Sequence, residues 1–252
     1  MSEGRVDGRR VIVITGAGGS LGAELSAQFA GEAGTDLVLS DVSGPSLDVT
    51  VSRLPPTDAA VETVLADVSE PAQVEAVTAH AVERFGRLDV LVSNAGVLSP
   101  NGRIHNLTTE DWERAFRVNV LGAVNGIRAA VPIMRAQGSG SIVLTASVAG
   151  LTAWSHAAPY CATKAAVIQL AKVAALEYAR DGIRVNTVCP GTFRSAIHDG
   201  LPPEALDTIA ARHPLGLGAT TDLVGAYSYL AGSDSRWTTG SALVVDGGYS
   251  AP

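Results

Sequence analysis

Cysteine, lysine and long apolar runs are all scarce in this sequence of 252 residues. Cys161 and Cys189 are the only cysteines, which argues against a disulfide framework or a cysteine-rich metal site and fits a reducing compartment. No uninterrupted apolar run approaches the roughly 18 residues that a membrane helix requires. The run from Val11 to Ile14 is too short for a signal peptide. We therefore expect a cytoplasmic protein, and we expect no metal site because no two histidines are spaced as ligands.

Positive charge is also in short supply. The 18 Lys and Arg residues are outnumbered by 25 Asp and Glu residues, for a formal net charge of -7. Proteins that bind nucleic acids or anionic membranes through charge normally need the opposite balance. We predict small-molecule partners, and neither nucleic acid nor membrane. Because 46% of the residues are hydrophobic and only 17% are charged, the chain can bury a substantial core.

Seven short apolar runs alternate with longer helical patterns along the chain. Most of these runs are continuous in Val, Ile and Leu rather than alternating, which is typical of strands buried on both faces of a parallel sheet. The sequence predicts an α/β fold, a doubly wound Rossmann-type parallel sheet of about seven strands with helices on both faces. We expect one domain over residues 1–252. The strand candidates are 11–15, 36–40, 61–66, 88–93, 141–147, 183–188 and 242–246.

Helical patterns occupy the stretches between these strands, and Ser69, Thr108 and Thr221 are candidate caps. The segment 43–56 is rich in glycine and proline, so it is expected to hold only a short helix. We expect 192–213 to be a flexible stretch beside the binding pocket. The other helix candidates are 21–33, 70–85, 109–136, 158–180 and 221–231.

The candidate helix at 158–180 is apolar around far more than one stripe. Such a helix is buried on two sides, one of which the sheet can supply. The other side is covered either by a second helix of the same chain or by a second subunit. We predict a homo-oligomer, either a dimer or a tetramer.

The first strand candidate runs directly into the glycine-rich segment 15–22, TGAGGSLG, which opens a helix. Glycines at this place let the backbone approach a pyrophosphate at the helix N-terminus, although a tight connection would use them too. Asp41 closes the second strand candidate about 20 residues later, where a carboxylate can accept the ribose hydroxyls of NAD. It would repel the 2′-phosphate of NADP. Asp41 therefore indicates NAD, with an ordinary surface acid as the alternative.

Tyr160 and Lys164 lie one helical turn apart, on the same face of the candidate helix. The chain holds only two lysines and five tyrosines, so this spacing is hardly expected by chance. Hydride transfer at an alcohol needs a group that gains and loses a proton. An adjacent ammonium and a cationic oxidised nicotinamide would lower the pKa of a phenol, which is about 10 in water. We predict Tyr160 as the general acid/base; an exposed stabilising pair is the alternative.

Together these motifs resemble those of the short-chain dehydrogenase/reductase family, in the same order over nearly the whole chain. The segment 15–22 resembles its glycine turn, Asp67 before Val68 its adenine-side aspartate, and VVDGG at 244–248 its C-terminal motif. The resemblance implies four catalytic residues with separate roles: Tyr160 exchanges the proton, Ser147 orients the substrate oxygen, Lys164 holds the nicotinamide ribose, and Asn119 positions a water.

The same resemblance implies which residues contact the cofactor. Ser20 departs from the family pattern, which has glycine there, and a serine hydroxyl could contact phosphate while its Cβ limits the backbone approach. Ser93 replaces the first asparagine of the usual Asn-Asn-Ala-Gly, and Ser195 stands where a threonine is common. The implied cofactor contacts are Gly16, Gly19, Ser20, Leu21, Gly22, Asp41, Asp67, Val68, Asn94, Ala95, Gly96, Tyr160, Lys164, Pro190, Gly191, Phe193 and Ser195.

We therefore predict an NAD-dependent oxidoreductase, an alcohol dehydrogenase or ketoreductase that moves a hydride between NAD(H) and a secondary alcohol or ketone. Two alternatives stay open. One is a 3-oxoacyl carrier-protein reductase, which usually prefers NADPH and would dock its partner on a patch that includes Arg128 and Arg135. The other is a protein that binds NAD without turnover. The same resemblance implies which residues contact substrate: Ser147, Trp154, His156, Phe193 and Ile197, with Val97, Leu98 and His198 nearby.

Overall fold

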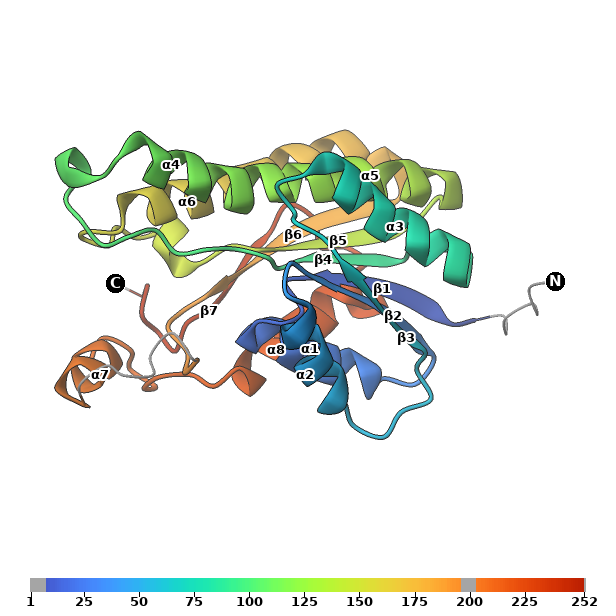
Figure 1. The fold of residues 1–252 in the computed structure, drawn as a ribbon, viewed down its shortest axis with the longest axis horizontal. Coiled ribbons are helices and arrows are strands. Elements are labelled where there is room, and N and C mark those ends of the chain that lie inside the picture. The colour runs from blue at the N-terminus through green and yellow to red at the C-terminus, as the bar shows by residue number, and fades with distance from the viewer. Residues whose placement is uncertain (1–7, 196–202, 252) are drawn as a thin grey trace.

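A parallel sheet of seven strands forms the centre of the computed structural model, which describes residues 8–195 and 203–251 (Figure 1). The strand order is β3-β2-β1-β4-β5-β6-β7, and every neighbouring pair is parallel. The predicted doubly wound sheet is confirmed. Because the order reverses between β1 and β4, a crevice is expected at their carboxyl ends. The strands are β1 (Arg10–Thr15), β2 (Thr35–Asp41), β3 (Val61–Leu65), β4 (Val90–Ser93), β5 (Gly140–Thr145), β6 (Ile183–Pro190) and β7 (Ala242–Val245).

Helices cover both faces of this sheet (Figure 1). One face carries α3 (Pro71–Phe85), α4 (Thr109–Phe116), α5 (Gly122–Gln137) and α6 (Ala158–Tyr178). The other face carries α1 (Ser20–Ala30), α2 (Gly44–Ser52) and α8 (Thr221–Ala231). The remaining helix, α7 (Pro203–Ala210), lies beyond the sheet at one end of the molecule.

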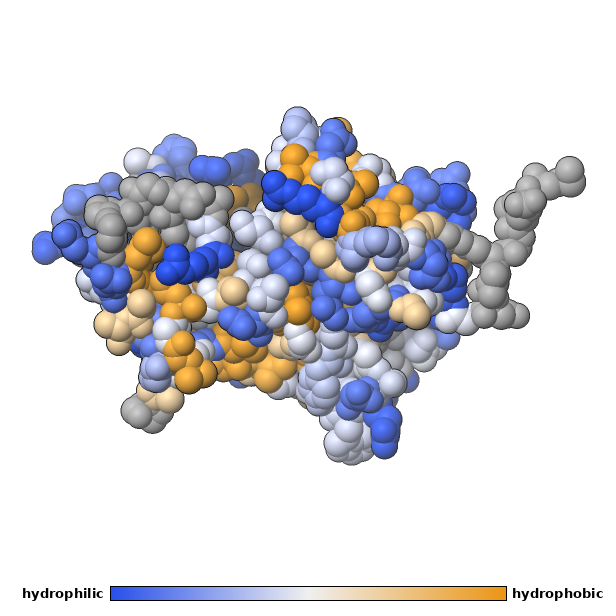
Figure 2. Space-filling model, turned by 90° about the horizontal axis from the view of Figure 1, so that it is seen from below, coloured by the Kyte–Doolittle hydropathy of each residue, from blue (hydrophilic) through white to orange (hydrophobic). Residues whose placement is uncertain are grey.

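Each face of the sheet has its own apolar core, and β1 contributes to both. Val11 and Val13 pack in the core beneath α3, α5 and α6, whereas Ile12 and Ile14 pack in the core shared with α1 and α8. Because successive strand residues point to opposite faces, a strand that is buried on both sides must be apolar at every position. The outer surface on the α1, α2 and α8 side is mixed, with apolar patches between polar residues (Figure 2).

The predicted single helix at 109–136 is wrong in one respect, because a π-helical segment, Arg117–Leu121, separates α4 from α5. Thr108 is confirmed as a cap: its side chain accepts from the N–H of Asp111, and the Asp111 carboxylate accepts from Thr108 in return. The short helix expected in 43–56 is confirmed as α2.

The other two predicted caps are wrong. Glu70 precedes α3, which starts with Pro71, and Thr220 precedes α8; neither side chain makes a capping hydrogen bond. The segment 192–213, for which flexibility was predicted, includes α7. Ile197 and His198 lie outside the described residues. In the described part of the chain, no helix is long and apolar enough to cross a membrane.

Candidate active site

A cavity of about 580 Å³ opens at the carboxyl edge of the sheet. Its walls come from the segments that follow β1 through β6, at the edge where open parallel sheets bind ligands. Every residue predicted to contact the cofactor lines this cavity, from Gly16 after β1 to Ser195 after β6. The cavity is within the size range of ordinary small-molecule and cofactor sites.

The glycine turn brings the N-terminus of α1 to this cavity. Gly16 adopts a φ of +67°, and a Cβ there would lie 2.7 Å from Ala95 Cα. A Cβ on Gly22 would lie 2.0 Å from the Gly16 carbonyl oxygen, so the helix packs directly on the turn. No side chain caps α1, and Ser20 and Leu21 line the cavity. The first N–H groups of a helix bind anions well, so this end suits a pyrophosphate.

Asp41 supports the glycine turn as well as lining the cavity. Its Oδ2 accepts from the Gly18 N–H at 2.9 Å, and its Oδ1 accepts from the Ser43 N–H at 3.0 Å. An ionised carboxylate has about four acceptor positions, so capacity remains for ribose hydroxyls. The uncapped helix end, this carboxylate and the size of the cavity together fit a dinucleotide.

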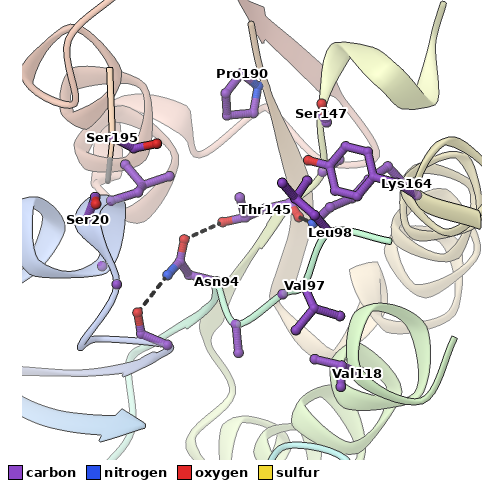
Figure 3. A pocket seen from close by; sticks show the side chains of 18 of the residues that line it. Ser20, Asn94, Val97, Leu98, Val118, Thr145, Ser147, Lys164, Pro190 and Ser195 are labelled. Atoms are coloured by element: carbon purple, nitrogen blue, oxygen red, sulfur yellow. Dashed lines mark hydrogen bonds between the residues drawn. The ribbon is translucent and has the colours of Figure 1, made fainter. Parts of the chain in front are cut away.

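Ser147 and Lys164 lie at the other end of the cavity (Figure 3). Tyr160 lines the same cavity. Ser147 follows β5, where its hydroxyl accepts from the Ala149 N–H at 3.1 Å. Tyr160 and Lys164 are one turn apart on α6, and Lys164 Nζ lies 5.8 Å from the centre of the Tyr160 ring. Lys164 is only 4% exposed and donates to the Thr145 carbonyl at 2.8 Å. A phenol, a hydroxyl and an ammonium thus share one small volume.

The acidity expected of Tyr160 differs from what the structure shows. Burial raises the pKa of the Tyr160 phenol, and its hydrogen bond with Ser147 offsets this only in part. Burial also lowers the pKa of Lys164 to about 8. The ammonium points toward a backbone carbonyl rather than toward the phenol oxygen, which explains why desolvation dominates.

Asn119 does not line the cavity, unlike the other three predicted catalytic residues. Its side chain lies in the π-helical segment and is 3% exposed. Its Oδ1 accepts from the Val97 N–H at 2.8 Å, and its Nδ2 donates to the Val97 carbonyl and to Thr163 Oγ1, each at 3.0 Å. In the structure, the Asn119 side chain fixes the backbone that forms the cavity wall.

The residues predicted to contact substrate are only partly brought together. Trp154 and Phe193 line the cavity with Ser147, and the rings of Trp154 and Tyr160 are 6.1 Å apart. The indole Nε1 of Trp154 is buried and has no hydrogen-bond partner among the described residues. His156 does not line the cavity; it is exposed, has a φ of +67° and hydrogen-bonds Ser155. Ile197 lies outside the described residues.

Several cavity residues were not predicted, and Thr145 is the most informative of them. A polar residue at the end of an otherwise apolar strand was its only signal in the sequence. Ala66, Arg114 and Val118 carry no comparable signal, because side chains that meet only in space leave no local pattern. Within 8–195 and 203–251, no cluster of three or more metal-binding side chains is present.

Known proteins resemble this chain over most of its length. A family model described as enoyl-(acyl carrier protein) reductase matches residues 16–250. The cis-4-hydroxycyclohexanecarboxylate dehydrogenase of Sinomonas cyclohexanicum is 36% identical, over 98% of this chain and 99% of that protein. The 3-oxoacyl-[acyl-carrier-protein] reductase of Thermotoga maritima is 34% identical, over 97% and 98%. The crystal structure of levodione reductase matches with a TM-score of 0.90 at 32% identity, over 96% and 98%. The chain belongs to the short-chain dehydrogenase/reductase family.

Proposed function

We propose that this protein oxidises a secondary alcohol, or reduces the corresponding ketone, with NAD(H) as cofactor and Tyr160 as the general acid/base. One observation carries the proposal. Tyr160, Ser147 and Lys164 share a single cavity with the uncapped start of α1 and the Asp41 carboxylate. Such a cavity offers a place for a dinucleotide and, beside it, the groups that handle a proton.

The chain's own residues account for the proton. When bound, the nicotinamide ring supplies or accepts the hydride and, in its oxidised form, adds a positive charge. Burial keeps Tyr160 protonated in the free protein, so it is ready to donate a proton to the oxygen of a ketone. In the oxidation direction, Tyr160 must accept a proton: burial raises its pKa, the Ser147 hydrogen bond offsets part of that rise, and a cationic neighbour would offset more of it. Lys164 would contribute its positive charge, and the N–H donors that Thr145 does not use, to the nicotinamide ribose.

Asp41 supports NAD over NADP as the cofactor. Its carboxylate lines the cavity next to the glycine turn, where it can accept ribose hydroxyls but would repel a 2′-phosphate. The adjacent Val42 lines the same region and carries no charge. The site therefore offers a 2′-phosphate no compensating cation at this position.

The substrate is proposed to be a small, mostly apolar secondary alcohol. Val97, Leu98, Trp154 and Phe193 give the cavity apolar walls, and the ring of Trp154 lies 6.1 Å from that of Tyr160. The name of the Sinomonas relative describes a ring that bears a secondary hydroxyl, and the levodione reductase structure has the same fold. A six-membered cyclic alcohol or ketone is accordingly the first compound class to assay. We also propose a cytoplasmic site of action, which the two unpaired cysteines support.

A carrier-protein reductase is a second candidate, because the Thermotoga relative is one. The predicted docking patch gives it little support. Arg135 is ion-paired with Asp181, and Arg128 lies in a shallow groove that also contains Glu75 and Glu83. A binder without turnover is less well supported, because Tyr160, Ser147 and Lys164 share one cavity.

The proposal is tested with cyclic and open-chain secondary alcohols and ketones, each assayed with NAD(H) and with NADP(H) by the absorbance of the reduced ring. We expect Tyr160→Phe to lower kcat at least about 100-fold, because a positioned acid/base contributes that much. The dissociation constant for NAD should change little. Tyr178→Phe, at the far end of the same helix, is the matched control and should retain turnover. Wild-type turnover in Tyr160→Phe would refute the assignment.

A further inference from the structure

A chain of partly buried hydrogen bonds runs from α8 to the glycine turn. The Tyr227 hydroxyl lies 2.9 Å from Thr145 Oγ1. Thr145 Oγ1 lies 3.3 Å from Asn94 Oδ1. Asn94 Nδ2 donates to the carbonyl oxygens of Thr15 and Gly16, at 3.2 and 3.1 Å. We call these side chains, from Tyr227 through Thr145 to Asn94, the relay (Figure 3 shows its Thr145 and Asn94 links).

The direction of every link in the relay is fixed by donor and acceptor chemistry. Both contacts of Asn94 Nδ2 are with carbonyl oxygens, so the other amide atom, Oδ1, must face Thr145 and can only accept. Thr145 therefore donates its single proton to Asn94. It has none left for Tyr227, so the Tyr227 hydroxyl must donate to Thr145. Each group in the relay points its proton toward the glycine turn.

Thr145 also connects the relay to the catalytic end of the cavity. Its carbonyl oxygen accepts from Lys164 Nζ at 2.8 Å. A single residue at the end of β5 thus holds Lys164 through its backbone and Asn94 through its hydroxyl. A shift of Thr145 would therefore move both Lys164, at the catalytic end of the cavity, and Asn94, at the glycine turn.

Tyr227 is well suited to hold Thr145 in place. It is fully buried in the core that α1 and α8 share, on the face of the sheet opposite Lys164. Burial raises the pKa of its phenol, so Tyr227 keeps its proton throughout the working pH range. The low local dielectric around so deeply buried a hydroxyl strengthens the hydrogen bond that it makes with Thr145.

We propose that Tyr227 is a positioning residue for the cofactor site, which acts through Thr145 on both the glycine turn and Lys164. This inference rests on the proposed function in so far as that site binds a nicotinamide dinucleotide. It assigns to α8, a helix that contributes no residue to the cavity wall, a part in holding both ends of that cavity.

The test compares two phenylalanine variants on the same helix. Tyr227→Phe removes only the relay hydroxyl, and we expect the dissociation constant for NAD to rise about 3- to 10-fold, the value of one hydrogen bond. Tyr229→Phe removes a hydroxyl that bonds Thr238 Oγ1, also at 2.9 Å, at the surface. It should leave NAD binding unchanged. Binding is followed by calorimetry well below the melting temperature of each variant.

A double-mutant cycle separates the relay from a general loss of stability. Thr145→Val removes the hydroxyl but keeps the carbonyl that holds Lys164, and it should weaken NAD binding to a similar extent. Adding Tyr227→Phe to Thr145→Val should then have no further effect, because the link is already broken. Thr145→Ser, which restores a hydroxyl, should bind NAD more tightly than Thr145→Val.

Each other outcome has a definite meaning. If Tyr227→Phe binds NAD as the wild type does, or if the two substitutions act independently, the inference is overturned, whatever happens to the melting temperature. If the wild type binds neither NAD nor NADP, the proposed function has failed instead. Should Tyr227→Phe not fold, the comparison of Thr145→Val with Thr145→Ser still tests the Thr145 hydroxyl through which Tyr227 is proposed to act. Equal NAD affinity in these two variants and the wild type would overturn the inference.

Discussion

Lys164 is a charged residue of the proposed active site whose burial destabilises the folded protein. Its side chain is nearly inaccessible, and burial lowers its pKa from 10.5 to about 8. Between those two pH values the unfolded chain holds a proton that the folded protein has released. Stability must therefore rise with pH through this window, because the unfolded state binds more protons there.

We expect Lys164→Met to be more stable than the wild type at pH 7, by about 2 kcal/mol. Removing the buried charge should stabilise the variant by about 3 kcal/mol. Losing the hydrogen bond to Thr145 should destabilise it by about 1 kcal/mol. The advantage should disappear as the pH rises from 8 to 10.5. Urea denaturation at several pH values measures it. Lys172→Met, which removes the exposed lysine of the same helix, should show no such dependence; a constant difference for Lys164→Met would contradict the expectation.

Asp41 allows the proposed preference for NAD to be tested at a single residue. We expect Asp41→Ala to narrow the preference for NAD over NADP by about tenfold or more, because the repulsion of a 2′-phosphate is removed. The ratio of the two kcat/KM values is the right measure, since the lost hydrogen bond to Gly18 affects both cofactors alike. Asp48→Ala, on the exposed side of α2, is the control. An unchanged ratio for Asp41→Ala would remove Asp41 from the cofactor site.

The sequence predicted the residues whose chemistry is local. Tyr160 and Lys164 were predicted from helical spacing, and Asp41 from its place after a strand. Thr145 and Tyr227 were not predicted, because 82 residues separate them and only the fold makes them neighbours. The raised pKa of Tyr160 was missed for a related reason, since desolvation depends on everything packed around a group and not on its nearest charge.

At the level of elements, the packing of α1 on the glycine turn leaves no room for a side chain. We expect Gly22→Ala to weaken NAD binding more than tenfold and to destabilise the protein, because its Cβ would meet backbone atoms of the turn. Gly225→Ala in α8 meets nothing within 4 Å and should instead add about 1 kcal/mol of stability. Calorimetric binding and thermal unfolding check both variants. Normal NAD affinity in Gly22→Ala would show that the turn can move.

Strands were easier to predict than helix boundaries. A strand buried on both faces has an unbroken apolar pattern, and all seven strand candidates overlap observed strands. The π-helical segment before α5 leaves no such pattern. Within it, Asn119 bonds the backbone of Val97, a contact that only the fold brings about. The predicted caps, Ser69 and Thr221, are each one residue away from the observed N-cap positions, Glu70 and Thr220. Composition alone does not fix where a helix begins.

For the whole molecule, the predicted homo-oligomer remains to be measured. On α6, Leu176 is 85% and Val173 is 44% exposed, and the adjoining π-helical segment adds Leu121 at 49%. Apolar side chains exposed on neighbouring elements favour burial against a second subunit. The structure thus leaves uncovered the second apolar side that the sequence indicated for this helix.

We expect light scattering after gel filtration to give the mass of a dimer or a tetramer. Leu176→Glu should shift the protein toward smaller species, because a charge would then lie in the contact. Val49→Glu, on α2 across the sheet, should leave the mass unchanged. A monomeric wild type at micromolar concentration would contradict the expectation.

The strand order has a consequence for how this chain can be made. β1 is synthesised first and ends in the interior of the sheet, β2 and β3 extend it on one side, and β4 to β7 extend it in sequence on the other. After β4 has joined β1, each new strand pairs with the one made just before it. The sheet can therefore form strand by strand as the polypeptide leaves the ribosome. From β4 onward, no later strand has to insert between two strands that are already paired.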